Sequence, residues 1–181
     1  MAIRRYLISM QANEPSLPHT QGLSDSAIDA AWAMMPPDME IVPTRLLPIV
    51  VGAHLRGEIA DRPLANRLVA AIRQWQRANI ADAEARLTAM VMTDVWYLND
   101  QDLLLQPTIA IGPPETNAAS AYYGNRLPRA YVVDGQLQVL ADLTFVEPSV
   151  TMWGVDAHTT RTALDWFIAR HLGNFLDSVH S

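Results

Sequence analysis

Apolar segments of strand length alternate with segments of helix type along most of this chain, and this alternation limits the fold more than any other feature. Strand-like runs occur at residues 46–52, 87–97, 108–112 and 149–155, and helix-type segments occur at 62–75, 115–123 and 159–176. Strands that alternate with helices form α/β folds, in which helices pack on the faces of a mostly parallel sheet. We therefore expect one three-layer α/β sandwich with a largely parallel sheet.

Two of the expected helices have clear apolar stripes. In the first, Asp61 can act as the cap and Pro63 lies in the first turn, and the helix either continues or restarts through residues 79–86. Its inward stripe is Leu64, Leu68, Ala71, Ile72 and Trp75. The last helix starts at Asp156 or Thr159, and the spacing of its stripe predicts one continuous helix. That stripe is Leu164, Phe167, Ile168, His171, Leu172, Phe175 and Leu176.

Turn residues add a hairpin and an appendage to this fold. Asp134 and Gly135 separate two apolar stretches, which is a strong signal for a β-hairpin. Pro48 is unfavourable in a central strand because proline has no N–H to donate. Residues 24–35 predict a short helix, and residues 11–37 predict a loop and helix appended to a single domain spanning residues 1–181.

Two missing residue types exclude whole classes of chemistry. The chain has no cysteine, and all 13 of its basic residues are arginine. Lysine Schiff bases, a phosphate-loop lysine, thiolate nucleophiles, disulfides and sulfur-bound zinc are therefore impossible. The sequence also lacks a G-x-S-x-G elbow, a G-x-G-x-x-G loop and a Walker motif, and it predicts neither a cofactor nor a metal. The lack of cysteine is compatible with a cytoplasmic location, which we expect.

Charge and hydropathy narrow the range of partners. The net charge is −6 and the arginines are scattered, so we expect no binding to nucleic acid. No apolar segment approaches about 18 residues, and the first residues predict no signal peptide, so we expect no membrane association. Five tryptophans and eight methionines leave apolar material for an interface, which favours a homo-oligomer.

The first candidate site is the turn after the strand at 108–112. Gly112, Thr116 and Asn117 would lie at the carboxyl end of that strand and at a helix N-terminus, where they could face a small anion. The alternative is structural: Gly112 turns the chain, and Thr116 or Asn117 caps the helix. The structural alternative is favoured because Pro113 and Pro114 remove two amide donors.

The second candidate site is the turn after the strand at 149–155. Asp156 and His158 could form an acid/base or metal-binding pair there, with Thr159 nearby and Arg161 holding an anionic substrate. The structural alternative, again favoured, is that Asp156 caps the helix, His158 is solvated, and Arg161 pairs with a carboxylate.

Two weaker patterns suggest divalent cations. Asp94, Asn99 and Asp100 follow a strand and carry oxygen ligands, although Asn99 and Asp100 are also typical turn residues. His54 and Glu58 are four residues apart, a spacing that would place them on one helix face.

Residues 107–172 carry a longer pattern, in which an apolar strand is followed by G-P-x-x-x-N and then by G-x-D-x-x-x-T-x-x-A-L-x-x-F-I. It resembles the α/β unit of archaeal surface-layer proteins and related uncharacterised proteins, with Ile111 in place of a first glycine. The resemblance implies a Rossmann-like sheet with no established catalysis, and it makes Asn117 and Asp156 possible mutual clamps at neighbouring turns. The matching residues are Gly112, Pro113, Asn117, Gly154, Asp156, Thr160, Ala163, Leu164, Phe167 and Ile168.

The sequence therefore predicts an α/β three-layer sandwich with a largely parallel, Rossmann-like sheet and one added β-hairpin. Its function is otherwise unassigned. The leading hypothesis is a non-catalytic intracellular protein that acts through assembly or partner contacts. The alternative is a protein or enzyme that binds a small anion or phosphate-containing ligand at the carboxyl ends of its strands.

Overall fold

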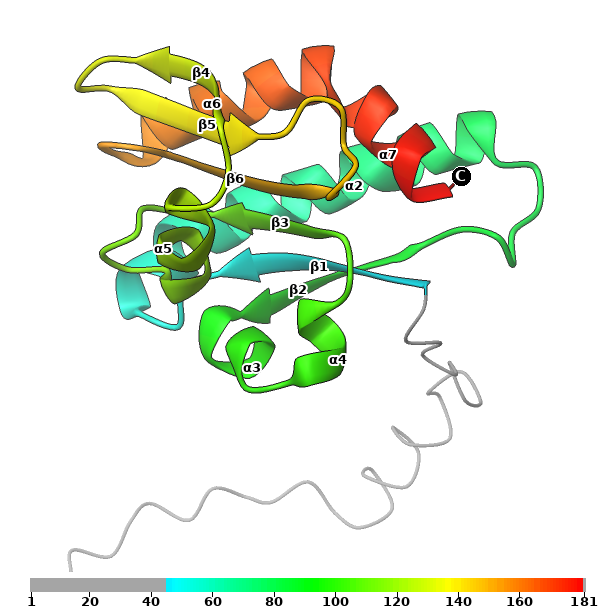
Figure 1. Cartoon of the computed structure of the whole chain (residues 1–181), viewed down its shortest axis with the longest axis horizontal. Helices are drawn as coiled ribbons and strands as arrows, with labels where there is room; N and C mark the ends of the chain where they lie inside the picture. Colours follow the sequence, from blue (N-terminus) through cyan, green and yellow to red (C-terminus); the bar gives the residue numbers. More distant parts are fainter. Residues whose placement is uncertain (1–44, 181) are drawn as a thin grey trace, which may run out of the picture. The chain divides into compact units, whose positions relative to one another are not determined.

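A computed structural model describes residues 45–180, which contain a six-stranded mixed sheet and its helices (Figure 1). The strands are β1 (Leu46–Val51), β2 (Thr88–Thr93), β3 (Thr108–Ile111), β4 (Arg129–Val133), β5 (Leu137–Ala141) and β6 (Ser149–Gly154). Their order across the sheet is β2-β1-β3-β6-β5-β4. The predicted α/β class is confirmed. The predicted helix at 24–35 and the appendage at 11–37 lie outside the described residues.

The sheet is parallel except at the hairpin. Strands β2, β1, β3 and β6 run in one direction, whereas β5 is antiparallel to both β6 and β4. The turn between β4 and β5 contains Asp134 and Gly135, as predicted, and Gly135 has a φ of +67°. This left-handed backbone conformation favours glycine because it has no Cβ.

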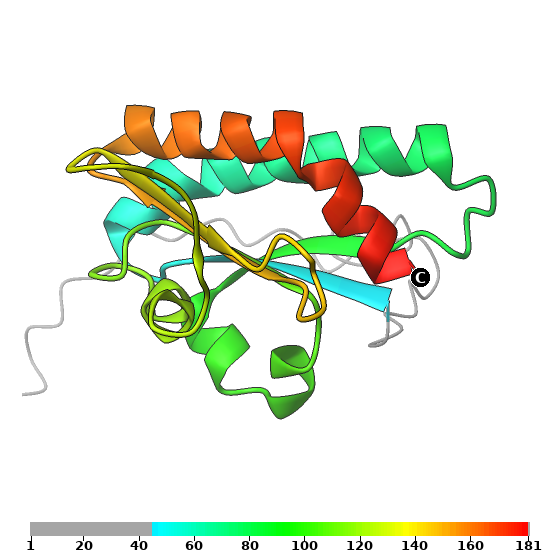
Figure 2. The same ribbon diagram turned by 45° about the horizontal axis from the view of Figure 1, so that its top comes forward.

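Helices cover both faces of the sheet. They are η2, a π-helical segment (Gly57–Asp61), α2 (Arg62–Asn79), α3 (Asp94–Leu98), α4 (Gln101–Leu104), α5 (Ala118–Gly124), α6 (Ala157–Arg170) and α7 (Leu172–His180). Figure 2 shows α2 and α6 side by side on one face, with α3, α4 and α5 on the other. No helix within residues 45–180 has both the length and the apolar character needed to cross a bilayer.

Two apolar clusters hold the helices to the sheet. Successive side chains of a strand point to opposite faces. Ile49 and Val51 of β1 accordingly pack in the cluster that contains α2, α6 and α7. Leu46 and Val50 pack in the cluster that contains α3, α4 and α5. Each buried aliphatic side chain of this kind contributes about 1.5–3 kcal/mol to folding.

Pro48 lies inside the central strand β1, at a position where the strand is paired on one side only. Strand β1 pairs with β2 along its whole length, from Leu46 to Val51. Its pairing with β3 begins only at Ile49. At Pro48 the strand therefore has one hydrogen-bonded neighbour instead of two, which is the condition of an edge strand, where proline is tolerated.

Three predicted boundaries are wrong. The strand expected at 87–97 ends at Thr93, whose hydroxyl accepts the N–H of Trp96 at 3.4 Å and starts α3. Asp61 makes no capping hydrogen bond, because helical backbone already precedes it in η2. Helix α2 ends at Asn79, so it neither continues nor restarts through residues 80–86.

The last helix is divided into two, although its start is confirmed. Asp156 and Thr159 form a reciprocal capping box at the beginning of α6. The backbone leaves helical geometry at His171, where φ is −130°, and α7 follows. The ring of His171 packs on Trp166 with 4.6 Å between centroids. The apolar spacing runs through this break because Leu172 and Phe175 of α7 join the same cluster as Phe167 of α6.

Candidate functional site

The carboxyl ends of β1 and β3 meet where the strand order reverses. From β1 the chain crosses to β2 on one side, and β3 lies on the other. Open α/β sheets bind ligands in the crevice that such a reversal creates. In this protein the loops that follow β1 and β3 touch each other at this point. A Cβ on Gly52 would lie 1.8 Å from the carbonyl oxygen of Thr116.

Asn117 joins these two strand ends. Its side chain is fully buried, and Nδ2 donates to the carbonyl oxygens of Val50 (3.1 Å) and Ile111 (2.9 Å). Its Oδ1 accepts the N–H of Ala119 at 3.0 Å and so caps α5. Both amide hydrogens are therefore committed to the chain, and this geometry favours the structural alternative for Asn117.

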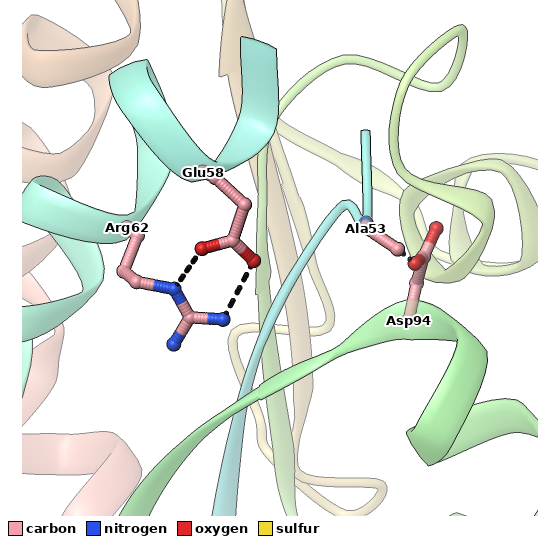
Figure 3. A network of polar contacts seen from close by, with 4 residues as sticks. All are labelled: Ala53, Glu58, Arg62 and Asp94. Carbon is pink, nitrogen blue, oxygen red and sulfur yellow. Dashed lines mark hydrogen bonds and ion pairs between the residues drawn. The ribbon is translucent and has the colours of Figure 1, made fainter. Parts of the chain in front are cut away.

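Asp94 forms a second junction at the same edge (Figure 3). Its Oδ1 accepts the backbone N–H groups of Ala53 and Val95, both at 2.8 Å, and its Oδ2 accepts that of Ala118 at 2.7 Å. A carboxylate that already binds three amides is poorly placed to ligate a cation. Asn99 and Asp100 bond to neighbouring backbone instead, and no group of three or more potential metal ligands occurs within residues 45–180.

The side chains of His54 and Glu58 bind to different residues. The Glu58 carboxylate forms a two-pronged ion pair with Arg62, one bond being 2.8 Å from Nη2 to Oε1 (Figure 3). This hydrogen bonding lowers the pKa of Glu58. Nδ1 of His54, an exposed residue, accepts the backbone N–H of Arg56 at 3.1 Å.

The second predicted site does not converge on a cavity. Asp156 accepts the N–H of Thr159 at 2.8 Å, and this bond is the main reason why the pKa of Asp156 is lowered. His158 is exposed. Arg161 is also exposed and lies 3.8 Å from the carboxylate of Asp165. Among the described residues, no hydrogen bond joins Asp156 to Asn117, so each fixes its own turn.

A cavity of about 350 Å³ lies beside the first predicted turn, and we call it the hairpin cavity. It is bounded by the turn after β3, the β4–β5 hairpin and the end of β6. Of the predicted site residues it contains only Thr116. The guanidinium of Arg56 lines it and donates to the carbonyl oxygen of Val155 at 3.3 Å. The lining residues are Arg56, Pro113, Glu115, Thr116, Val133, Gly135, Gln136, Leu137, Gln138, Trp153, Gly154 and Val155.

Asp61 is a buried carboxyl group next to this cavity. Its side chain is 3% exposed, and no described residue donates a hydrogen bond to it. Position 112 favours glycine for two reasons. A Cβ there would lie 2.5 Å from Oδ2 of Asp61, and the backbone φ is +112°. Burial raises the pKa of Asp61 to about 6, and the charge of Arg56 opposes the rise.

Sequence reasoning missed Arg56 and Asp61 as site residues. Pro63 and an apolar stripe follow Asp61, so the sequence pattern predicts a helix cap there. The positional argument that selected Gly112, at the carboxyl end of a strand, applies equally to the segment after β1 and would have found both.

Comparison of the chain with protein-family models, with curated proteins and with solved structures yields no match.

Proposed function

We propose that this protein binds a small molecule carrying an anionic group in the hairpin cavity, with Arg56 as the anchor of the anion. The observation that carries the proposal is the position of the Arg56 guanidinium in the cavity wall, where one of its five N–H donors is used by Val155. The remaining donors suit a carboxylate or a phosphate, which arginine binds in a two-pronged manner. The volume falls within the range of ligand pockets.

Two features of the wall support binding beyond the charge of Arg56. Trp153 offers an aromatic wall, and Thr116 and Gln136 offer polar groups that could orient a ligand. The other predicted site residues do not line the cavity; they are Gly112, Asn117, Asp156, His158, Thr159 and Arg161.

Calorimetry and thermal shift would test this function with small carboxylates and inorganic phosphate as probes. A ligand at about a hundred times its Kd adds about 2.7 kcal/mol of stability, which raises Tm by several degrees in a chain of this length. We expect Arg56→Gln to abolish the rise. Arg73→Gln, which removes an exposed arginine from α2, should retain it. An equal rise in both variants would refute Arg56 as the anchor.

Assembly into a homo-oligomer is a second proposed function. It is supported by Leu105 and Val146, which are 81% and 82% exposed and line one groove at the amino ends of β3 and β6. Exposed apolar side chains gathered in one groove favour a contact surface.

We further propose the finer description of the fold, a three-layer Rossmann-like sandwich similar to the surface-layer unit. The apolar clusters on the two faces and the reversal of strand order at β1 support it. A non-catalytic role and an intracellular location stay predictions of the sequence.

A further inference from the structure

Asp61 is a buried carboxyl group that accepts no hydrogen bond from any side chain or backbone amide within residues 45–180. A buried carboxylate normally accepts several hydrogen bonds, because an unpaired one loses its hydration without compensation. Asp94, at the same edge of the sheet, shows the usual arrangement with three backbone amides. Asp61 accepts none from the described residues, so a donor from outside the chain would meet a carboxylate in a low-dielectric setting that no other group uses.

The position of Asp61 connects it to the hairpin cavity. Its Oδ2 lies over Gly112, and the next residue, Pro113, is part of the cavity wall. Arg56, which lines the same wall, is the charged group whose field reaches Asp61. Asp61 therefore lies behind the turn of Gly112 and Pro113, one residue from the cavity wall that Arg56 lines.

We propose that the ligand of the hairpin cavity is a zwitterion of amino-acid type, whose anionic group pairs with Arg56 and whose ammonium group pairs with the Asp61 carboxylate. This inference rests on the proposed function and names its ligand class. A metal ion is a poorer occupant, because the other carboxylates of η2 and α3 are already used by Arg62 and by backbone amides. An ammonium group needs only one carboxylate and carries three donors, two of which can reach backbone carbonyls or water.

The decisive experiment compares amines with their deaminated counterparts. Affinities would be measured by calorimetry at pH 7.5 for glycine against acetate, β-alanine against propanoate, 4-aminobutanoate against butanoate, and a set of larger α-amino acids against the matching carboxylates. We expect at least one amine to bind about tenfold more tightly than its partner, as a charge-assisted bond to a buried group implies. Asp61→Asn should reduce that preference to about twofold or less.

A matched control separates a direct contact from a general change of charge. Asp134→Asn makes the same substitution at an exposed position beside the cavity, and Asn-Gly forms the hairpin turn as well as Asp-Gly does. It should keep the preference for the amine. Loss of that preference in Glu115→Gln, with retention in Asp61→Asn, would move the ammonium to Glu115 and overturn the inference.

The outcomes distinguish this inference from the proposed function. Equal affinities for amines and deaminated carboxylates, both dependent on Arg56, would overturn the zwitterion and keep the anion site. Binding that ignores Arg56, or no binding by any member of the series, would overturn both. The comparison of amine with carboxylate in the native protein decides whether the ligand is a zwitterion, whatever the folding of the variants. Asp61→Asn and Glu115→Gln then decide which carboxylate holds the ammonium group.

Discussion

At the scale of single residues, the carboxyl edge of the sheet is held by buried polar side chains. Asn117 bonds to β1, β3 and α5, and Asp94 bonds to the loop after β1 and to the first residue of α5. Each replaces water at backbone groups that would otherwise be buried without a partner. The turn after β3, which is the first candidate site, thus joins strands and helix, and its outer surface forms one wall of the hairpin cavity.

Replacement of Asn117 tests this junction. Asn117→Ala removes a helix cap and leaves two strand carbonyls without a donor, so we expect a loss of about 2–4 kcal/mol. Asn117→Asp should lose at least as much, because a carboxylate cannot donate to Val50 and Ile111. Urea unfolding followed by tryptophan fluorescence measures the effect. Asn79→Ala, at an exposed helix end, should change stability by about 0.5 kcal/mol or less.

Asp61 makes stability depend on pH in an unusual direction. Its pKa is about 6 in the folded protein against 3.8 for the free side chain, so the folded state binds the proton more tightly. The stability that protonation provides is complete below pH 3.8 and is lost as pH rises through 6, by about 3 kcal/mol at most. We expect Asp61→Asn to match the native protein near pH 4 and to unfold at higher urea at pH 8. A difference that shrinks with rising pH would contradict this.

At the scale of elements, local signals were sufficient where the structure depends on neighbours in sequence. The hairpin at Asp134 and Gly135, the capping box of Asp156 and Thr159, and the stripe of α2 were all predictable for this reason. The boundaries that failed depend on distant groups. Strand β2 ends at Thr93, which caps α3 locally, but the amides of Ala53 and Ala118 that Asp94 binds beside it come from distant segments.

Helical backbone starts before Asp61, in η2, and this start also depends on contacts with another segment. The contact can be tested at Gly57. Alanine favours a helix over glycine by about 1 kcal/mol, so propensity alone predicts that Gly57→Ala stabilises the protein. A Cβ on Gly57 would lie 2.6 Å from the backbone oxygen of Gly52, and overpacking costs about 1–3 kcal/mol. We expect a net loss in urea unfolding. Gly173→Ala in α7, where the nearest atom is 3.4 Å away on Trp75, should be neutral or stabilising. Stabilisation by both would mean that η2 does not pack as described.

At the scale of the whole molecule, the sequence pointed to the edge of the sheet where the hairpin cavity lies, and it missed most of the residues that line this cavity. Thr116 could be placed there because strand ends attract ligands in this fold class. The other walls come from the hairpin and from the segment after β1, which are brought together only when β5 and β6 pair and β1 takes its place in the sheet. Such a cavity depends on three separate chain segments, and no local pattern encodes it.

The opposite edge of the sheet carries the groove through which we propose that the protein assembles. Leu105 precedes β3 and Val146 precedes β6, and because these strands are parallel neighbours both side chains lie at their amino ends. Exposure above 80% for two large apolar residues in one groove is unfavourable in water, and a second copy would relieve it.

We expect light scattering to give a multiple of the 20.1 kDa monomer mass, and Leu105→Ser combined with Val146→Ser to shift the mass to the monomer. Ile59→Ser, which removes a 69% exposed residue at the carboxyl edge, should leave the mass unchanged. A native protein that is monomeric at high concentration would contradict assembly through this groove, and it would leave the hairpin cavity as the feature that defines the function.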